Sequence, residues 1–194
     1  MPRLTLIGYR GTGKSTIAAL VARRLGCGWT DADAVLEKKL GCTITALVRE
    51  RGEPVFRDAE AAVLDDLLAS ADGILATGGG VVLRPENRAA LARRGRPIVW
   101  LTAPAETIRG RLVADPTTAS RRPALVTAAD GTASGDPLAE VDAALAARAP
   151  LYRDCADAIF DTAVATPEEI ADAIVAWLAS RVRPVGAPFV EDRS

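Results

Sequence analysis

The chain has 194 residues, a formal net charge of −1 and no histidine. This length suits one domain with a substantial core. The lack of histidine excludes Ser-His-Asp catalysis and histidine-ligated zinc, and a net charge near zero gives no reason to expect a nucleic-acid partner. Any acid–base chemistry therefore falls to carboxylates or lysine.

The sequence gives no sign of membrane insertion or secretion. It has no run of about 18 apolar residues, and an apolar strand is expected within a few residues of Met1, which leaves no room for a signal peptide. We therefore expect a cytoplasmic protein without a membrane partner, and a monomer by default. The three cysteines are widely spaced and form no C-x-x-C pair, which favours idle or buried thiols over a redox or metal role.

Short apolar runs alternate with helical patterns along the chain, which predicts an α/β fold with a parallel sheet. Strands are expected near residues 4–8, 28–32, 73–77, 97–101 and 158–161. Helices are expected between them, with starts at Asp136 and at Thr166, where a capping box precedes an apolar stripe. Residues 1–180 form one predicted domain.

Two stretches lack periodicity. Residues 113–135 are long for a connection in a compact domain, so we expect them to form a mobile lid. Residues 181–194 are expected to form a flexible tail.

The first predicted strand runs into a G-x-x-x-x-G-K-S pattern that spans Gly8 to Ser15. Apolar residues at helical spacing follow it, and strand, glycine loop and helix are the setting that a phosphate-binding loop requires. Lys14 would reach the β- and γ-phosphates of a nucleotide, and the Ser15 hydroxyl would bind Mg²⁺. The alternative, a glycine-rich turn with a chance lysine, does not account for this setting.

Two carboxylates, Asp31 and Asp33, follow the second predicted strand. Ligands of open α/β sheets bind at the carboxyl ends of the strands. Asp31 could therefore bind a magnesium water, and Asp33 could accept a hydrogen bond or a proton from a substrate hydroxyl. A solvated loop is the alternative explanation for the pair.

Further charged residues and glycines could complete a site. Arg57 and Glu60 lie at i, i+3 on one helix face, although this spacing alone favours an ordinary surface ion pair. The three glycines 78–80 exceed what a turn needs and indicate backbone close to a ligand. Arg122, in the aperiodic loop, and Arg148, near the end of the following helix, could simply be solvated, although an arginine on a mobile loop facing a phosphate loop could also neutralise a transferring phosphoryl group.

Taken together and in order, these motifs resemble the shikimate kinase family, P-loop kinases of the nucleoside-monophosphate-kinase type. The motifs are G-x-x-G-x-G-K-S-T at 8–16, D-x-D at 31–33, G-E-x-x-F-R-x-x-E at 52–60, G-G-G at 78–80, R-P at 122–123 and R-x-P-L-Y at 148–152. The resemblance extends to about residue 178. It implies a three-layer P-loop NTPase fold with strand order 2-3-1-4-5, and transfer of the ATP γ-phosphoryl group to the 3-hydroxyl of shikimate in aromatic amino-acid biosynthesis.

The resemblance also implies residues that bind ATP: Gly11, Thr12, Gly13, Lys14, Ser15, Thr16 and Arg122. Ser15 would bind Mg²⁺, with Asp31 helping through water. Arg122 would close with the lid onto the phosphates. Lys14, Asp33 and Arg122 would be the catalytic residues.

On the acceptor side, the resemblance implies seven residues that bind shikimate: Asp33, Arg57, Glu60, Gly78, Gly79, Gly80 and Arg148. Arg57 and Arg148 would clamp the carboxylate, which suits the fork geometry of guanidinium groups. Gly79 would offer a backbone amide, and Glu60 would support Arg57.

The chain departs from the family pattern near the expected adenine site. An arginine usually lies shortly before the lid R-P, whereas Arg109 and Arg111 lie further upstream here, and residues 163–166 replace a late arginine. A kinase for another small hydroxy acid, such as quinate or gluconate, is the nearest alternative. A nucleotide-dependent switch is disfavoured, because the chain has no glutamine and only one asparagine, Asn87, and so lacks the guanine-reading N-K-x-D and a Ras-type glutamine.

Overall fold

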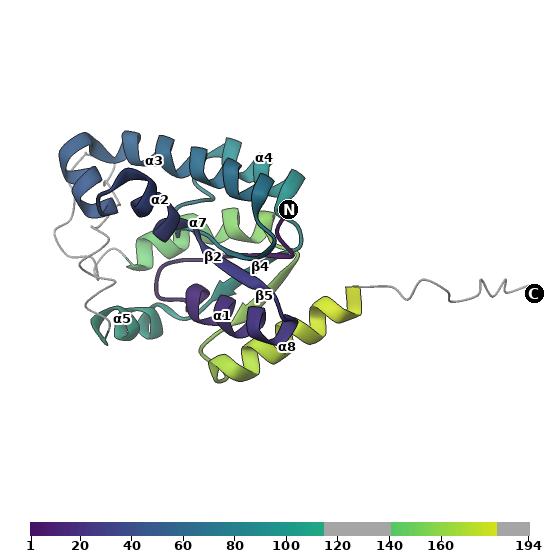
Figure 1. Ribbon diagram of the computed structural model, residues 1–194. Helices are drawn as coiled ribbons and strands as arrows, with labels where there is room; N and C mark the ends of the chain where they lie inside the picture. The colour runs from purple at the N-terminus through teal and green to yellow at the C-terminus, as the bar shows by residue number, and fades with distance from the viewer. Residues whose placement is uncertain (115–140, 182–194) are drawn as a thin grey trace, which may run out of the picture.

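A parallel sheet lies between two layers of helices (Figure 1). The computed structural model describes residues 1–114 and 141–181. The lid expected at 113–135 begins two residues too early, because residues 113 and 114 end a helix. The rest of the expected lid lies outside the described residues, and so do Arg122 and the helix start expected at Asp136. Arg181 belongs to a helix and stacks over the Trp177 ring at 4.8 Å, so the expected tail begins one residue too early; residues 182–194 are not described.

The sheet has five strands in the order β2-β3-β1-β4-β5, all paired in parallel. They are β1 (Leu4–Ile7), β2 (Gly28–Asp31), β3 (Gly73–Ala76), β4 (Ile98–Thr102) and β5 (Ala158–Asp161). Each lies where the sequence predicts a strand, to within one residue at either end. The predicted strand order is therefore confirmed.

The apolar runs of the central strands bury both faces of the sheet. Leu4 and Leu6 of β1 pack into one core with α1 (Lys14–Leu25) and α8 (Pro167–Arg181). Ile7 packs into the opposite core. Because successive side chains of a strand point to opposite faces, a continuous apolar run is what a doubly covered sheet needs.

The second face is covered mainly by α3 (Ile44–Ser70), α4 (Pro85–Arg94) and α7 (Val141–Cys155). In Figure 1 these helices lie above the sheet, while α1 and α8 lie below it. Two further helices, α2 (Ala32–Leu40) and α5 (Ala105–Ala114), follow the carboxyl ends of β2 and β4. The expected three-layer arrangement is thus confirmed.

Local sequence signals account for a helix start and a helix interruption. The capping box before α8 is confirmed, since Glu169 N–H donates to Thr166 Oγ1 at 3.3 Å and Thr166 N–H to Glu169 Oε2 at 2.8 Å. The hydrogen bonds that the Thr166 N–H and hydroxyl donate to Glu169 Oε2 lower the pKa of Glu169. In α3, Gly52 adopts φ 84° and interrupts the helix, a conformation that glycine accepts readily. The second half of α3, which carries Arg57, begins after this bend.

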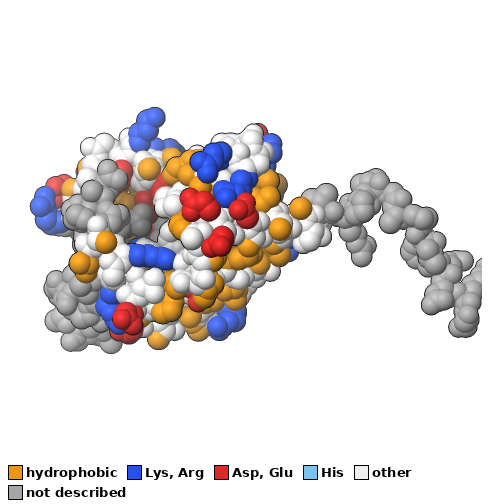
Figure 2. All heavy atoms as spheres, turned by 90° about the horizontal axis from the view of Figure 1, so that it is seen from below, with side chains coloured by type: hydrophobic (Ala, Val, Ile, Leu, Met, Phe, Trp, Pro, Cys, Tyr) orange, Lys and Arg blue, Asp and Glu red, His pale blue; other side chains and the backbone are white. Residues whose placement is uncertain are grey.

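The outer surface carries charges of both signs. Figure 2, which views the molecule from the side of α8 in Figure 1, shows acidic and basic side chains interspersed with apolar ones. Arg24 of α1 forms an exposed ion pair with Asp172 of α8. None of the helices in ranges 1–114 and 141–181 combines the length and apolar character needed to cross a membrane.

Candidate active site

The loop between β1 and α1 is held together by its own backbone. A β-carbon on Gly8 would lie 2.2 Å from the carbonyl oxygen of Leu101, so only glycine lets β1 turn this closely against β4. The Lys14 side chain is only 7% exposed, and Nζ donates to the carbonyl oxygens of Gly8 at 2.8 Å and Tyr9 at 2.9 Å. The ammonium group therefore lies inside the loop that the sequence assigns to phosphate.

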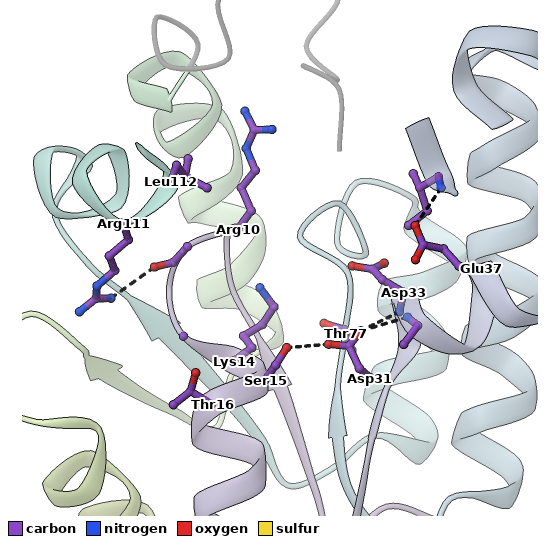
Figure 3. A pocket seen from close by; sticks show the side chains of 14 residues that line it. Arg10, Lys14, Ser15, Thr16, Asp31, Asp33, Glu37, Thr77, Arg111 and Leu112 are labelled. Atoms are coloured by element: carbon purple, nitrogen blue, oxygen red, sulfur yellow. Dashed lines mark hydrogen bonds between the residues drawn. The ribbon is translucent and has the colours of Figure 1, made fainter. Parts of the chain in front are cut away.

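The predicted metal residues meet at the start of α1 (Figure 3). Ser15 Oγ donates to Asp31 Oδ2 at 2.6 Å, and Asp31 Oδ1 accepts the N–H groups of Asp33 at 3.0 Å and Ala34 at 3.3 Å. A hydroxyl and a carboxylate suit Mg²⁺, which binds one or two protein oxygens together with phosphate and water. Neither 1–114 nor 141–181 contains a group of three or more metal-binding side chains. The fit for Mg²⁺ therefore rests on Ser15 and Asp31 together with nucleotide phosphates.

Asp33 lies on the same pocket as the phosphate loop. It stands in the first turn of α2 and is 7% exposed. The pocket encloses about 360 Å³, and its lining includes Lys14, Ser15, Asp31 and Asp33. Because β2 and β1 flank β3 in the sheet, their carboxyl ends bring a carboxylate pair to the phosphate loop. Asp31 and Asp33 therefore line one pocket together with the phosphate loop.

Arg57 is the centre of a buried ionic cluster. Its Nε and Nη2 donate to Glu53 Oε1 at 3.1 and 2.9 Å, and its Nη1 donates to Glu60 Oε2 at 2.8 Å. The side chains of Arg57 and Glu60 are 8% and 7% exposed. The prediction from spacing alone, that this ion pair lies at the surface, is therefore wrong. Burial of an ion pair removes both charges from water, and this desolvation penalty offsets much of their attraction. The pair is therefore better explained by a binding site than by a contribution to stability.

Two of the three glycines, Gly78 and Gly80, make room for this cluster. A β-carbon on Gly80 would lie 2.0 Å from Arg57 Nη1, and one on Gly78 would lie 2.7 Å from Glu60 Oε1 and 2.8 Å from Asp33 Oδ1. The missing side chains thus let charged groups of α2 and α3 reach the loop after β3. The sequence predicts backbone close to a ligand at these glycines; the close neighbours of Gly78 and Gly80 in the structure are side chains of the protein itself.

Arg148 of α7 completes the arrangement from the other side. It is buried, its guanidinium lies over the Tyr9 ring at 5.4 Å, and its Nη1 lies 3.5 Å from the carbonyl oxygen of Gly79. A β-carbon on Gly79 would in turn lie 3.1 Å from the backbone nitrogen of Arg10. The phosphate loop, the glycine loop and α7 therefore meet at one place.

The family model described as shikimate kinase matches residues 10–179. The chain belongs to the shikimate kinase family.

Relatives and solved structures support this membership over most of the chain. A shikimate kinase of Oleidesulfovibrio alaskensis is 42% identical, with 83% of this chain and 88% of the relative aligned. One from Pseudomonas syringae pv. syringae is 40% identical over 92% of this chain and 97% of the relative. The structure of the Acinetobacter baumannii shikimate kinase in complex with shikimate has a TM-score of 0.80 and 31% identity, covering 92% of this chain and 93% of that chain.

A gluconokinase structure from Sinorhizobium meliloti has a TM-score of 0.52 at 15% identity, covering 92% of this chain and 91% of that chain. At this identity the likeness shows the fold alone.

In this shikimate kinase family member, only one of the two candidate adenine arginines reaches the phosphate loop. Arg111 Nη1 donates to Thr162 Oγ1 at 2.8 Å and to the carbonyl oxygen of Gly11 at 3.3 Å. Its Nη2 donates to the Thr162 carbonyl oxygen at 2.6 Å. Arg109 instead pairs with Asp142 at 2.5 Å. Arg111 is therefore the one placed beside the nucleotide loop, where it ties α5 to the end of β5.

Sequence reasoning gave no role to two charged residues of this shikimate kinase family member. Glu53 holds the Nε edge of Arg57, and its i, i+4 spacing from Arg57 was the available signal. Arg10 lines the pocket together with Lys14 and Asp33; its place inside the phosphate-loop motif was the signal. The third predicted catalytic residue, Arg122, lies outside the described residues.

Proposed function

We propose that the chain transfers the γ-phosphoryl group of ATP to the 3-hydroxyl of shikimate, giving shikimate 3-phosphate and ADP. One observation carries the proposal: the phosphate loop with Lys14 shares a pocket with Asp33, beside the buried Arg57 and Arg148. Membership of the shikimate kinase family supports it, as does the shikimate bound in the Acinetobacter baumannii relative.

On the nucleotide side, backbone amides at the start of α1 and the Lys14 ammonium would hold the phosphates, since helix N-termini favour anions. Gly11, Thr12, Gly13 and Thr16 would form the rest of this cradle. Ser15 directly and Asp31 through water would hold Mg²⁺, which when bound neutralises charge on the β- and γ-phosphates. Arg122 would add a positive charge from the lid, a role that rests on the family resemblance.

On the acceptor side, Asp33 would orient the attacking hydroxyl and take its proton, within the buried setting that the structure gives it. The new bond joins the shikimate oxygen to the γ-phosphorus, the bond to the bridging oxygen of ADP breaks, and the proton leaves through Asp33. Positioning and charge neutralisation are what such a transfer needs.

Two arginines would bind the shikimate carboxylate. Arg57 and Arg148 approach the glycine loop at Gly80 and Gly79 respectively. A buried carboxylate needs paired charges and hydrogen bonds, and planar guanidinium groups supply both. Glu60 would keep Arg57 in place. The loop at 78–80 would line the shikimate-binding site formed with Asp33, Arg57 and Arg148, called the acceptor seat below. ATP and shikimate are the proposed partners of a cytoplasmic monomer, without nucleic acid or membrane.

The acceptor is tested by measuring ATP consumption with Mg²⁺ and shikimate, quinate or gluconate in parallel. We expect shikimate to give the highest kcat/KM by about 10²-fold, because buried polar groups left unpaired by an analogue are costly. A higher kcat/KM with gluconate or quinate would replace shikimate as the substrate. The absence of turnover with all three would reject the proposal.

Substitution Arg148→Ala is expected to raise the KM for shikimate by about 10²-fold with a smaller change in kcat, because it removes a charge-assisted hydrogen bond to a buried carboxylate. Arg153→Ala is the matched control, since Arg153 lies on the same helix but is exposed. Steady-state kinetics at saturating ATP measure the difference. An unchanged KM would argue against Arg148 as a carboxylate clamp.

Substitution Glu53→Ala is expected to raise the KM for shikimate roughly tenfold, equivalent to about 1.4 kcal/mol, because Arg57 loses the partner of its Nε edge. Asp58→Ala is the control on the same helix, since Asp58 pairs at the surface with Arg84 at 2.6 Å. Equal KM values for the two variants would show that Glu53 does not position Arg57.

A further inference from the structure

Tyr152 ends the R-x-P-L-Y motif and has no role in the chemistry above. Its side chain is only 1% exposed, and its ring stacks on Trp100 with centroids 5.6 Å apart. Its hydroxyl donates a hydrogen bond to the carbonyl oxygen of Gly79. A buried tyrosine hydroxyl commonly finds a partner, but this partner belongs to the glycine loop of the acceptor seat.

The Tyr152 hydroxyl makes the stronger of the two side-chain hydrogen bonds to the Gly79 carbonyl oxygen. Arg148, one helical turn earlier on α7, reaches the same oxygen from 3.5 Å, which is long for a hydrogen bond. Burial raises the pKa of Tyr152 well above its usual value, and the hydroxyl therefore remains a donor across the neutral pH range.

The direction of one carbonyl fixes the direction of the next amide. Among the described residues, only Arg96–Pro97 is a cis peptide, so the bond between Gly79 and Gly80 is trans. In a planar trans peptide, the N–H points opposite to the C=O. Because α7 holds the Gly79 oxygen, the Gly80 N–H points away from α7. Arg57 Nη1 lies beside the same glycine, 2.0 Å from where its β-carbon would be.

We propose that Tyr152 is a positioning residue that directs the Gly80 N–H, next to Arg57, at the carboxylate of the acceptor. The two arginines and this amide then supply hydrogen-bond donors from α3, α7 and the glycine loop. Because the glycines have no side chains, Tyr152 holds their backbone in place. This inference rests on the proposed function, since it assigns a role within the acceptor seat.

The variant Tyr152→Phe tests the inference, because it removes the hydroxyl and keeps the ring on Trp100. The KM for shikimate is expected to rise about tenfold, while kcat and the KM for ATP stay within about twofold, as for a lost ground-state contact. With a shikimate analogue that carries a methyl group in place of the carboxylate, kcat/KM of the two proteins should be equal. Cys155→Ala, a buried change on the same helix, should lower the Tm without altering the KM.

An equal loss of kcat/KM with shikimate and the methyl analogue would overturn the inference, because the hydroxyl would then act only through stability. An unchanged KM would overturn it as well. In the unsubstituted protein, the Gly80 amide proton should shift downfield in NMR spectra on addition of shikimate but not of the methyl analogue, and no shift would also overturn it. Lack of turnover of shikimate by the unsubstituted protein would instead reject the proposed function.

Discussion

Substitution Lys14→Ala is expected to lower kcat with shikimate by more than about 10²-fold, as the loss of a preorganised charge at a phosphoryl group implies. Lys14 is buried within the phosphate loop and donates to the carbonyl oxygens of Gly8 and Tyr9. Its ammonium group is therefore poised beside the expected β- and γ-phosphates. No other side chain of the loop carries a positive charge at this depth, since Arg10 is more exposed.

The same substitution also removes two hydrogen bonds within the loop, so the loss of charge must be separated from a loss of structure. Lys14→Met keeps much of the side-chain volume without the charge, and it should show the same fall in kcat as the alanine variant. Lys39→Ala is the matched control, because Lys39 pairs with Asp66 at the surface. Turnover of Lys14→Ala close to that of the control would refute the role given to the loop.

Substitution Asp33→Asn is expected to reduce kcat by about 10²- to 10³-fold, the range typical of a lost general base. The asparagine keeps the size of the side chain and one acceptor oxygen but cannot take a proton. Because Asp33 lies on α2 while the phosphates are expected on the loop before α1, the Kd for ATP should change by less than about twofold, as for a contact made only in the transition state.

Two measurements locate this effect. Titration of ATP in the absence of shikimate gives the nucleotide Kd, and single-turnover kinetics give the rate of transfer. Asp66→Asn, an exposed change on α3, is the control for the loss of one carboxylate. A marked fall in ATP affinity in Asp33→Asn would move Asp33 out of the acceptor seat and onto the nucleotide side.

The sheet and the phosphate loop were predictable from sequence because their signals are local. Leu4, Leu6 and Ile7 make the segment before the loop largely apolar, as is typical of a strand covered on both faces. Gly8 follows where the backbone must pass close to β4. The position of Asp31 after a strand likewise places it at the ligand edge of the sheet. In such cases the residues that determine the structure are neighbours in the chain.

Other features depend on segments that are distant in sequence. The spacing of Arg57 and Glu60 predicts that they pair, but burial of the pair depends on the loop at 78–80 packing against α3. The contacts of Arg111 with Gly11 and Thr162 join segments that lie 100 and 51 residues away from it in the chain. The bond from Tyr152 to Gly79 is of the same kind. Periodicity within a single helix carries no information about such contacts.

The close packing above Gly80 makes certain substitutions depend on one another. A side chain at position 80 would collide with the Arg57 guanidinium, which two glutamates hold in place. Randomising the glycine loop alone should therefore return glycine at this position. Libraries that vary positions 57 and 80 together could yield variants that accept differently shaped substrates, which no single replacement would allow. New substrate preferences in this scaffold should therefore evolve through paired changes.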